Sequence, residues 1–265
     1  MNEKVLKCAQ EVSLIHKEKA QHAVLCYHGY TGYPGELMLP AKLLYDSGFD
    51  VFIPRYPGHG TSGEDFMKSN STMWVHRALT AYRAIEEEYE TISIIGHSMG
   101  GLIALKVAHE VRLVSKIVLY APALLLNRPI PSALLSLVSL CKKRKKVEWK
   151  RDPAFSFYDE RDEGDDAYLG KEYWSYIYYK QVGELEKLRK EVLSFLDTIS
   201  TPTLVFTGGL DTTVDPQVGT LIEKGTKSKD NRWIDLPNAT HLIPYDKDDA
   251  SRSLAMQETL VFLTP

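Results

Sequence analysis

The segment Ser93-Ile94-Ile95-Gly96-His97-Ser98-Met99-Gly100-Gly101 decides the fold of this 265-residue chain. Its first half is rich in β-branched side chains, which favour extended backbone and predict a short buried strand. Residues 102–109, which follow it, are apolar on most faces and predict a buried helix. The residues between these two elements therefore form a strand-to-helix turn.

The turn carries the pattern Gly96-x-Ser98-x-Gly100, which is typical of a nucleophile elbow. In such a turn the two backbones approach closely, so side chains two positions before and two positions after the serine would clash. The strained turn lifts the serine hydroxyl to the carboxyl edge of the sheet. It also leaves the N–H of Met99 at the start of a helix, where it can donate to an oxyanion.

The length suits one large domain, or one domain that carries an insertion. Apolar residues make up 44% and charged residues 25%, which is typical of a soluble globular protein. The net charge of −3 gives no support to a polyanionic partner, so we do not expect nucleic-acid binding. The three cysteines, Cys8, Cys26 and Cys141, are too few and too widely spaced to predict a disulfide framework or a zinc site.

Neither the first residues nor any apolar stretch of the sequence predicts secretion or membrane insertion. Residues 1–5 lack the apolar core of a signal peptide. No apolar stretch approaches the roughly 18 residues that a membrane span requires. We therefore expect a cytoplasmic protein without a transmembrane segment.

Strands and helices alternate along most of the chain, which predicts an α/β fold with a mostly parallel central sheet and helices on both faces. Residues 3–18 favour one or two edge strands. The predicted internal strands are 23–27, 51–54, 92–95, 116–120, 203–207 and 232–236. The predicted helices are 40–46, 71–89, 102–109, 216–224 and 247–263.

The alternation stops between residues 123 and 200, where the sequence predicts no strand. We expect this span to be a helical cap, or lid, inserted into a core made of residues 1–122 and 201–265. The cap contains an apolar stretch, a basic run, an acidic run, a cluster of aromatic residues and an amphipathic helix, at 133–140, 142–146, 159–166, 168–179 and 184–196 respectively. Ligand pockets commonly form between two such layers.

Two features of the cap each allow two interpretations. The apolar stretch with its basic run can form an amphipathic helix that rests on an anionic membrane surface, or it can be a solvated run beside a pocket-lining helix. The tyrosines can pack the cap onto the core, or they can stack on an aromatic substrate.

Four chemically important segments fall at the carboxyl ends of predicted strands, namely His28-Gly29-Tyr30, Ser98, Asp211 and His241. Ligands bind at this edge in open α/β sheets. A neutral serine is a poor nucleophile, and it needs a base whose tautomer is fixed by a third group. The order serine, acid, histidine along the chain fits this requirement.

Other residues compete for these roles. Asp215 also follows the strand that precedes Asp211, although it resembles a helix cap before Pro216. His28 and His59 precede glycines in turns and are expected to brace loops by hydrogen bonds. His97 adjoins Ser98, but alternation along a strand predicts that its side chain points elsewhere. Asp246 is interpreted as a cap or surface residue.

The whole chain resembles the α/β-hydrolases, and among them the small carboxylesterases and the monoacylglycerol lipases. The matching segments are His28-Gly29-Tyr30-Thr31-Gly32, Pro57-Gly58-His59-Gly60, Gly96-His97-Ser98-Met99-Gly100-Gly101, Gly208-x-x-Asp211 with Val214, and His241 before the final helix. The cap matches no single subfamily.

This resemblance implies a serine esterase that requires neither a metal nor an organic cofactor. Ser98 is the expected nucleophile, His241 the base and Asp211 the acid. The main-chain N–H groups of Tyr30 and Met99 are expected to hold the oxyanion and, with Gly29, to contact the substrate. The expected substrate is a small-molecule ester, with a short to medium acyl chain or a monoglyceride.

Two kinds of alternative remain open from sequence. The same three residues can act on another bond, as in a peptidase, a thioesterase or a carbon–carbon hydrolase. Alternatively, the protein can use the pocket of this fold to bind a small molecule without catalysing a reaction.

Overall fold

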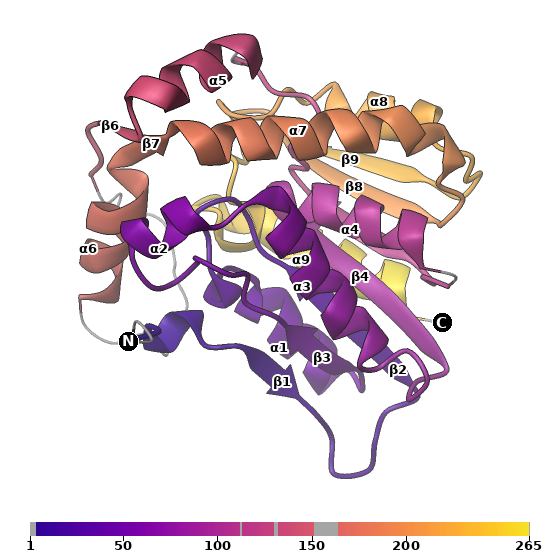
Figure 1. Ribbon diagram of the computed structural model, residues 1–265. Coiled ribbons are helices and arrows are strands. Elements are labelled where there is room, and N and C mark those ends of the chain that lie inside the picture. Colours follow the sequence, from indigo (N-terminus) through magenta and orange to yellow (C-terminus); the bar gives the residue numbers. More distant parts are fainter. Residues whose placement is uncertain (1–3, 112, 130–131, 151–163, 265) are drawn as a thin grey trace.

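A seven-stranded mixed sheet forms the centre of the protein (Figure 1). The structure, a computed structural model, describes residues 4–111, 113–129, 132–150 and 164–264. The strand order is β1-β3-β2-β4-β5-β8-β9, and every pairing is parallel except that of β1 with β3. The strands are β1 (Val12–Leu14), β2 (His22–Tyr27), β3 (Asp50–Ile53), β4 (Thr91–His97), β5 (Ile117–Tyr120), β8 (Thr203–Gly208) and β9 (Arg232–Leu236). The predicted α/β fold class is confirmed.

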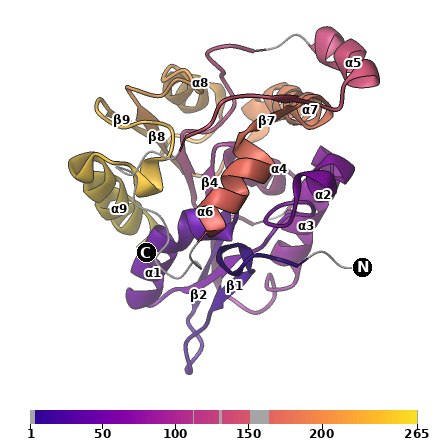
Figure 2. The ribbon, with the colours of Figure 1, turned by 90° about the vertical axis from the view of Figure 1, so that its left-hand side faces the viewer.

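Helices cover both faces of the sheet, so its central strands are buried on two sides. Helices α1 and α9 contact each other on one face, whereas α3, α4 and α7 contact one another on the opposite face (Figure 2). The helices of the core are α1 (Met38–Asp46), α2 (Gly63–Lys68), α3 (Ser71–Arg83), α4 (Met99–Glu110), α8 (Val218–Gly225) and α9 (Asp249–Leu263).

Two helices differ from the sequence prediction. Helix α3 ends at Arg83 instead of residue 89, and the three glutamates at 86–88 lie beyond its end. Acidic side chains are unfavourable at the negative end of a helix dipole, which explains the early end. The short helix α2 was not predicted, although Ser62 caps it by accepting the N–H of Asp65 at 3.2 Å.

The segment 123–200 contains helices and also two short strands, so the expectation that it lacks strands is wrong. Its elements are α5 (Ser132–Cys141), β6 (Arg144–Lys146), α6 (Asp165–Leu169), a π-helical turn (Gly170–Trp174), β7 (Tyr176–Tyr178) and α7 (Tyr179–Phe195). Strands β6 and β7 pair antiparallel, and the guanidinium of Arg144 lies 4.3 Å from the centre of the Tyr176 ring. A basic strand has no apolar alternation, so periodicity could not reveal it.

Most of the acidic run, residues 159–163, lies outside the described residues. The predicted amphipathic helix at 184–196 is confirmed as the main part of α7. Helix α7 begins at Tyr179, five residues earlier than expected.

Two tyrosines of the segment that is expected to form the cap pack onto helix α2 and the loop before it. Tyr173 and Tyr178 are buried, and their rings lie 5.7 Å and 5.1 Å from the ring of Phe66 in α2. The hydroxyl of Tyr173 donates to the carbonyl of Gly58 at 2.9 Å and accepts the N–H of Thr61 at 2.9 Å. The packing interpretation is confirmed for these two tyrosines.

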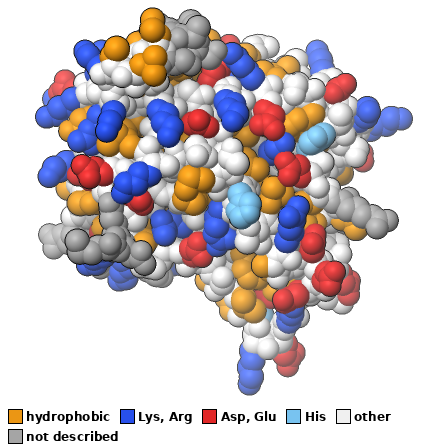
Figure 3. All heavy atoms as spheres, in the orientation of Figure 1, with side chains coloured by type: hydrophobic (Ala, Val, Ile, Leu, Met, Phe, Trp, Pro, Cys, Tyr) orange, Lys and Arg blue, Asp and Glu red, His pale blue; other side chains and the backbone are white. Residues whose placement is uncertain are grey.

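The outer surface of the cap combines exposed leucines with lysines. In α5, Leu137 is 65% exposed and Leu140 is 83% exposed. Figure 3 shows apolar side chains over α5, with basic side chains along α7 beside them. No helix in the described ranges has both the length and the apolar character needed to cross a membrane.

Candidate active site

The turn between β4 and α4 places Ser98 at the carboxyl edge of the sheet. Ser98 has φ +53° and ψ −114°, a strained conformation for a residue with a side chain. A Cβ atom on Gly96 would lie 2.4 Å from the carbonyl oxygen of Gly100, and one on Gly100 would lie 1.8 Å from that of Tyr27. The two glycines are therefore required for the reason that the sequence indicated.

Three polar side chains meet in a row at this edge. The Oγ of Ser98 lies 3.0 Å from Nε2 of His241, and Nδ1 of His241 lies 2.7 Å from Oδ2 of Asp211. A carboxylate oxygen accepts, so Nδ1 of His241 carries the proton and Nε2 is free to accept from the serine hydroxyl. Ser98 and Asp211 are buried, whereas the side chain of His241 is about a quarter exposed.

Both carboxylate oxygens of Asp211 accept hydrogen bonds. Its Oδ1 accepts the N–H groups of Thr213 at 2.7 Å and Val214 at 3.0 Å. Burial acts to raise the pKa of Asp211, but the hydrogen bond and charge of His241, together with these two amides, hold the pKa below its ordinary value. The competing residue, Asp215, accepts the N–H of Gln217 at 2.9 Å in a turn and lies outside this row.

The other two candidate histidines brace loops, as predicted. Nδ1 of His28 bonds to the carbonyl of Gly29 at 3.1 Å, and Nδ1 of His59 bonds to the carbonyl of Pro57 at 3.2 Å. Both rings are fully buried. Burial lowers the pKa of His28 well below its ordinary value and that of His59 to about 3, so both are neutral at neutral pH.

His97 does not point away from the site. Its ring centre lies 5.1 Å from that of His241, and its Nε2 lies 3.0 Å from the main-chain carbonyl oxygen of His241. The alternation argument fails here because β4 ends at His97. The left-handed conformation of Ser98 turns the chain back on itself, so both side chains face one edge.

Asp246 is a buried residue, and its interpretation as a surface residue is wrong. Its carboxylate accepts the N–H of Thr240 at 2.6 Å and also bonds to the Thr240 hydroxyl. It further accepts the N–H of Asp248 at 2.9 Å. Asp246 therefore fixes the loop that carries His241, a role that its position before a helix did not indicate.

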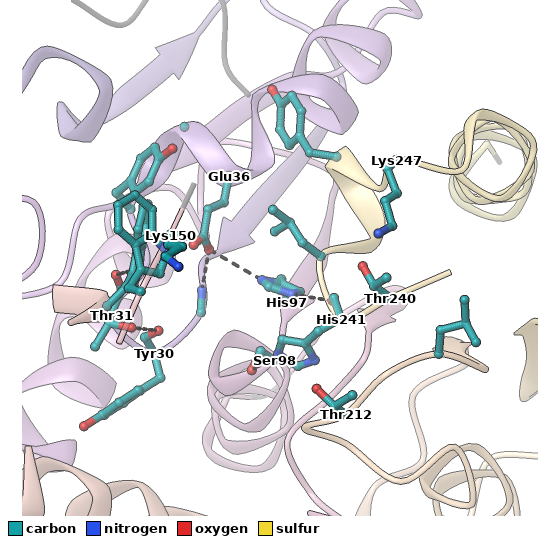
Figure 4. Close-up of a pocket in the computed structure, with 18 residues that line it drawn as sticks. Tyr30, Thr31, Glu36, His97, Ser98, Lys150, Thr212, Thr240, His241 and Lys247 are labelled. Carbon is teal, nitrogen blue, oxygen red and sulfur yellow. Dashed lines mark hydrogen bonds and ion pairs between the residues drawn. The ribbon is translucent and has the colours of Figure 1, made fainter. Parts of the chain in front are cut away.

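A cavity of about 560 Å³ lies in front of Ser98 and His241 (Figure 4). Gly29 and Tyr30 line it, and Met99 is buried at the first position of α4. One wall is aromatic because Trp149 and Trp174, both from the cap, lie with ring centres 5.3 Å apart. Thr31, Thr212, Thr240, Leu210, Leu242 and Tyr245 line other parts of the cavity.

The cap tryptophans are held by specific contacts that the sequence did not reveal. The indole N–H of Trp174 donates to the carbonyl of Thr31 at 3.3 Å. The ring of Trp149 lies against Gly170, where a Cβ atom would be 2.0 Å from the indole. Among the residues with described positions, no cluster of three His, Cys, Asp or Glu side chains has the arrangement of a metal site.

Comparisons with known proteins place the chain in a family. A profile described as serine aminopeptidase, S33, matches residues 18–248. A carboxylesterase of Bacillus subtilis (strain 168) is 25% identical over 244 residues, which cover 91% of this chain and 92% of the relative. A thermostable monoacylglycerol lipase of Bacillus sp. (strain H-257) is 25% identical over 244 residues, which cover 88% of each chain.

Solved structures agree in fold. A structure from work on the metagenome-derived lipolytic enzymes LipS and LipT has a TM-score of 0.82, with 22% identity and 98% of both chains covered. A soluble variant of monoglyceride lipase from Saccharomyces cerevisiae, in complex with a substrate analogue, has a TM-score of 0.73 and 18% identity, and the match covers 99% of this chain and 96% of that one. The chain belongs to the serine aminopeptidase S33 family, and it is an α/β-hydrolase similar to carboxylesterases and monoacylglycerol lipases.

Proposed function

We propose that this chain is a serine carboxylesterase that hydrolyses small esters of short to medium acyl chain, or monoglycerides. The observation that carries the proposal is the continuous row from Ser98 through His241 to Asp211, with contacts of 3.0 Å and 2.7 Å. Carboxylesterase and monoacylglycerol lipase relatives that align with most of the chain support the same class of substrate.

The reaction proceeds through an acyl-enzyme. Oγ of Ser98 attacks the ester carbonyl carbon while Nε2 of His241 takes the hydroxyl proton. The bond from carbon to the alcohol oxygen then breaks, and His241 gives that proton to the departing alcohol. Water attacks the acyl-enzyme in the same way, with its proton taken by His241 and returned to Ser98.

Two groups of residues assist this chemistry. Asp211 holds the tautomer of His241 and stabilises the imidazolium that forms. The N–H groups of Tyr30 and Met99 donate to the oxyanion, and each such donor contributes about 3 kcal/mol in the transition state. Gly29, which lines the same cavity, contacts the substrate beside them.

The cavity favours an ester over an amine-bearing peptide. An aminopeptidase needs a free carboxylate near its nucleophile to bind the substrate ammonium. Glu36 is the one acidic side chain among the described residues that line the cavity, and its carboxylate already accepts the N–H of Gly29 at 3.1 Å. Lys150 and Lys247 also line the cavity and repel a cationic substrate.

Hydrolysis of p-nitrophenyl acetate, butyrate and longer esters, and of a monoglyceride, tests the proposal. Ser98→Ala is expected to lower kcat by several powers of ten, as loss of a nucleophile does in such a unit. The control is Ser47→Ala, which changes an exposed serine at the end of α1 and is expected to retain full activity. Equal rates for wild type and Ser98→Ala would refute the proposal.

Two further experiments separate the alternatives. A substrate panel that includes peptides, thioesters and carbon–carbon substrates identifies the bond that is cleaved fastest. A fluorophosphonate probe is expected to label Ser98, and an unlabelled Ser98 in folded protein would indicate a small-molecule-binding protein instead.

A further inference from the structure

Glu36 and His97 connect the two loops that flank Ser98 (Figure 4). Glu36 lies in the short 3₁₀ turn Pro34–Leu37, after β2, and its Oε2 accepts the N–H of Gly29 at 3.1 Å. The same oxygen lies 3.5 Å from Nδ1 of His97. Nε2 of His97 in turn lies 3.0 Å from the carbonyl oxygen of His241. The contacts therefore run without a gap from the Gly29 loop to the His241 loop.

The contact with the carbonyl oxygen fixes the tautomer of His97. A carbonyl oxygen can only accept, so Nε2 of His97 carries a proton and donates a hydrogen bond to the main-chain carbonyl oxygen of His241. Nδ1 of the same ring then faces the Glu36 carboxylate. It is a buried atom with no hydrogen-bond partner at normal length. The ring therefore donates to the His241 main chain through Nε2, while its Nδ1 faces the Glu36 carboxylate at 3.5 Å.

The surroundings leave these groups little freedom. The side chain of His97 is 5% exposed and that of Glu36 is 13% exposed. The Glu36 carboxylate lies against the backbone of Gly32, where a Cβ atom would be 2.3 Å from its oxygen. A Cβ atom on Gly29 would lie 3.2 Å from Nδ1 of His97. The imidazole and the carboxylate are therefore enclosed by the loop that contains Tyr30.

We propose that Glu36 and His97 act as a pair of positioning residues. They hold the Tyr30 N–H and the imidazole of His241 at fixed positions on the two sides of Ser98. Glu36 binds the amide next to that of Tyr30 and so orients the oxyanion loop. His97 binds the main chain of His241 and so fixes the distance of its ring from Oγ of Ser98. The inference rests on the proposed function, because it concerns the geometry of the same reaction.

A positioning role predicts a loss in kcat with little change in KM, since the pair supports transition-state geometry through the two loops that it joins. His97→Leu and Glu36→Leu are each expected to lower kcat about 10- to 100-fold, the range expected for misplacement of catalytic groups by about 1 Å. The rate of labelling by a fluorophosphonate is expected to fall in parallel. The control, His76→Gln, changes an exposed histidine of α3 and is expected to leave kcat unchanged.

Conservative variants distinguish positioning from a general loss of structure. Glu36→Gln keeps an oxygen for the N–H of Gly29 and offers an N–H to Nδ1 of His97, so it is expected to retain kcat within about threefold. His97→Gln places an amide N–H near the carbonyl of His241 and is expected to recover most of the loss in His97→Leu. The double variant Glu36→Leu with His97→Leu is expected to be no worse than the poorer single variant, because the two residues act as one unit.

A spectroscopic measurement keeps the inference testable if the leucine variants fail to fold. In wild-type protein with ¹⁵N-labelled histidine, the spectrum of His97 is expected to show a proton on Nε2. A His97 ring protonated only on Nδ1 would overturn the inference, and so would a His97→Leu variant with wild-type kcat. If Ser98→Ala abolishes hydrolysis while the His97 and Glu36 variants stay fully active, this inference fails and the proposed function stands. If Ser98→Ala stays active, the proposed function itself fails.

Discussion

The buried carboxylate of Asp246 accepts the main-chain N–H of Thr240 at 2.6 Å and so fixes the residue that precedes His241. Asp246→Ala leaves this N–H without a partner, and such a loss costs about 1–3 kcal/mol of unfolding free energy. We expect the variant to have a lower melting temperature and a lower kcat, because His241 loses the support of its loop. The measurements are thermal unfolding and ester hydrolysis.

The matched control for that experiment is Asp249→Ala, at an exposed residue three positions after Asp246. Asp249 forms an exposed ion pair with Arg252 at 2.6 Å, and surface pairs of this kind contribute less than about 1 kcal/mol. Equal stability and activity losses for Asp246→Ala and Asp249→Ala would contradict the assigned role of Asp246.

Asp211 and Asp215 provide a direct comparison of two nearby acids. Asp211→Asn is expected to lower kcat by about 10⁴-fold, because an amide in place of the carboxylate favours the wrong tautomer of His241. Asp215→Asn is expected to retain activity, since the Asp215 carboxylate accepts the N–H of Gln217 in a turn away from His241. Steady-state kinetics of the two variants on one ester test this difference. A severe loss in Asp215→Asn alone would reverse the assignment.

Buried histidines predict a loss of stability in acid. The pKa of His59 is lowered to about 3 in the folded protein, whereas an unfolded histidine titrates near 6.5. Between these values the unfolded chain binds more protons, so the free energy of unfolding falls as pH decreases below about 6.5. The slope reaches about 1.4 kcal/mol per pH unit for each such histidine, and His28 adds to it in the same direction.

Denaturant unfolding between about pH 7.5 and about pH 5 measures this slope. His59→Gln is expected to be less stable at neutral pH but to have a shallower dependence on pH. The exposed His76→Gln is the control and is expected to keep the wild-type slope. A His59→Gln protein with the full wild-type slope would show that His59 is not responsible for it.

Gly170 determines the place of Trp149 in the cavity wall. Gly170→Ala forces the indole to move, because a Cβ atom there would overlap it at 2.0 Å. We expect kcat/KM for the longer esters to fall about tenfold relative to acetate, since the acyl chain loses contact with a fixed aromatic wall. Tryptophan fluorescence and an acyl-chain profile measure the change.

Gly183→Ala in α7 is the control for Gly170→Ala. The nearest atom to its added Cβ is 4.0 Å away, so the methyl group meets no obstacle. Alanine favours a helix over glycine, and the variant is expected to gain about 1 kcal/mol of stability with an unchanged acyl profile. An acyl profile that also stays unchanged in Gly170→Ala would remove Trp149 from the substrate site.

The exposed leucines of α5 allow the two interpretations of this segment, contact with an anionic lipid surface and a solvated run, to be tested against each other. We expect the protein to sediment with anionic vesicles and less with neutral ones. Replacement of Leu137 and Leu140 by serine is expected to weaken this binding, whereas Leu113→Ser, at another exposed leucine, is expected to leave it intact. Equal sedimentation of all variants with anionic vesicles would support the solvated interpretation.

The sequence was most informative where local chemistry alone determines structure. The glycines around Ser98 and the alternation of strands with helices predicted the sheet and its functional edge. Periodicity could not predict β6, because a basic strand pairs through its backbone and has no apolar face to reveal it. The contacts of His97 and Asp246 depend on which loops the sheet brings together, so they became visible only in three dimensions.

The sheet order has a consequence for the synthesis of this protein on the ribosome. Ser98 follows β4 at the middle of the sheet, whereas Asp211 and His241 follow β8 and β9 at its far side. A nascent chain that has emerged only as far as the cap holds its serine without the acid and the imidazole. Under the proposed mechanism, its hydroxyl lacks a base until β9 has docked, so ester hydrolysis begins only after the last strand has joined the sheet.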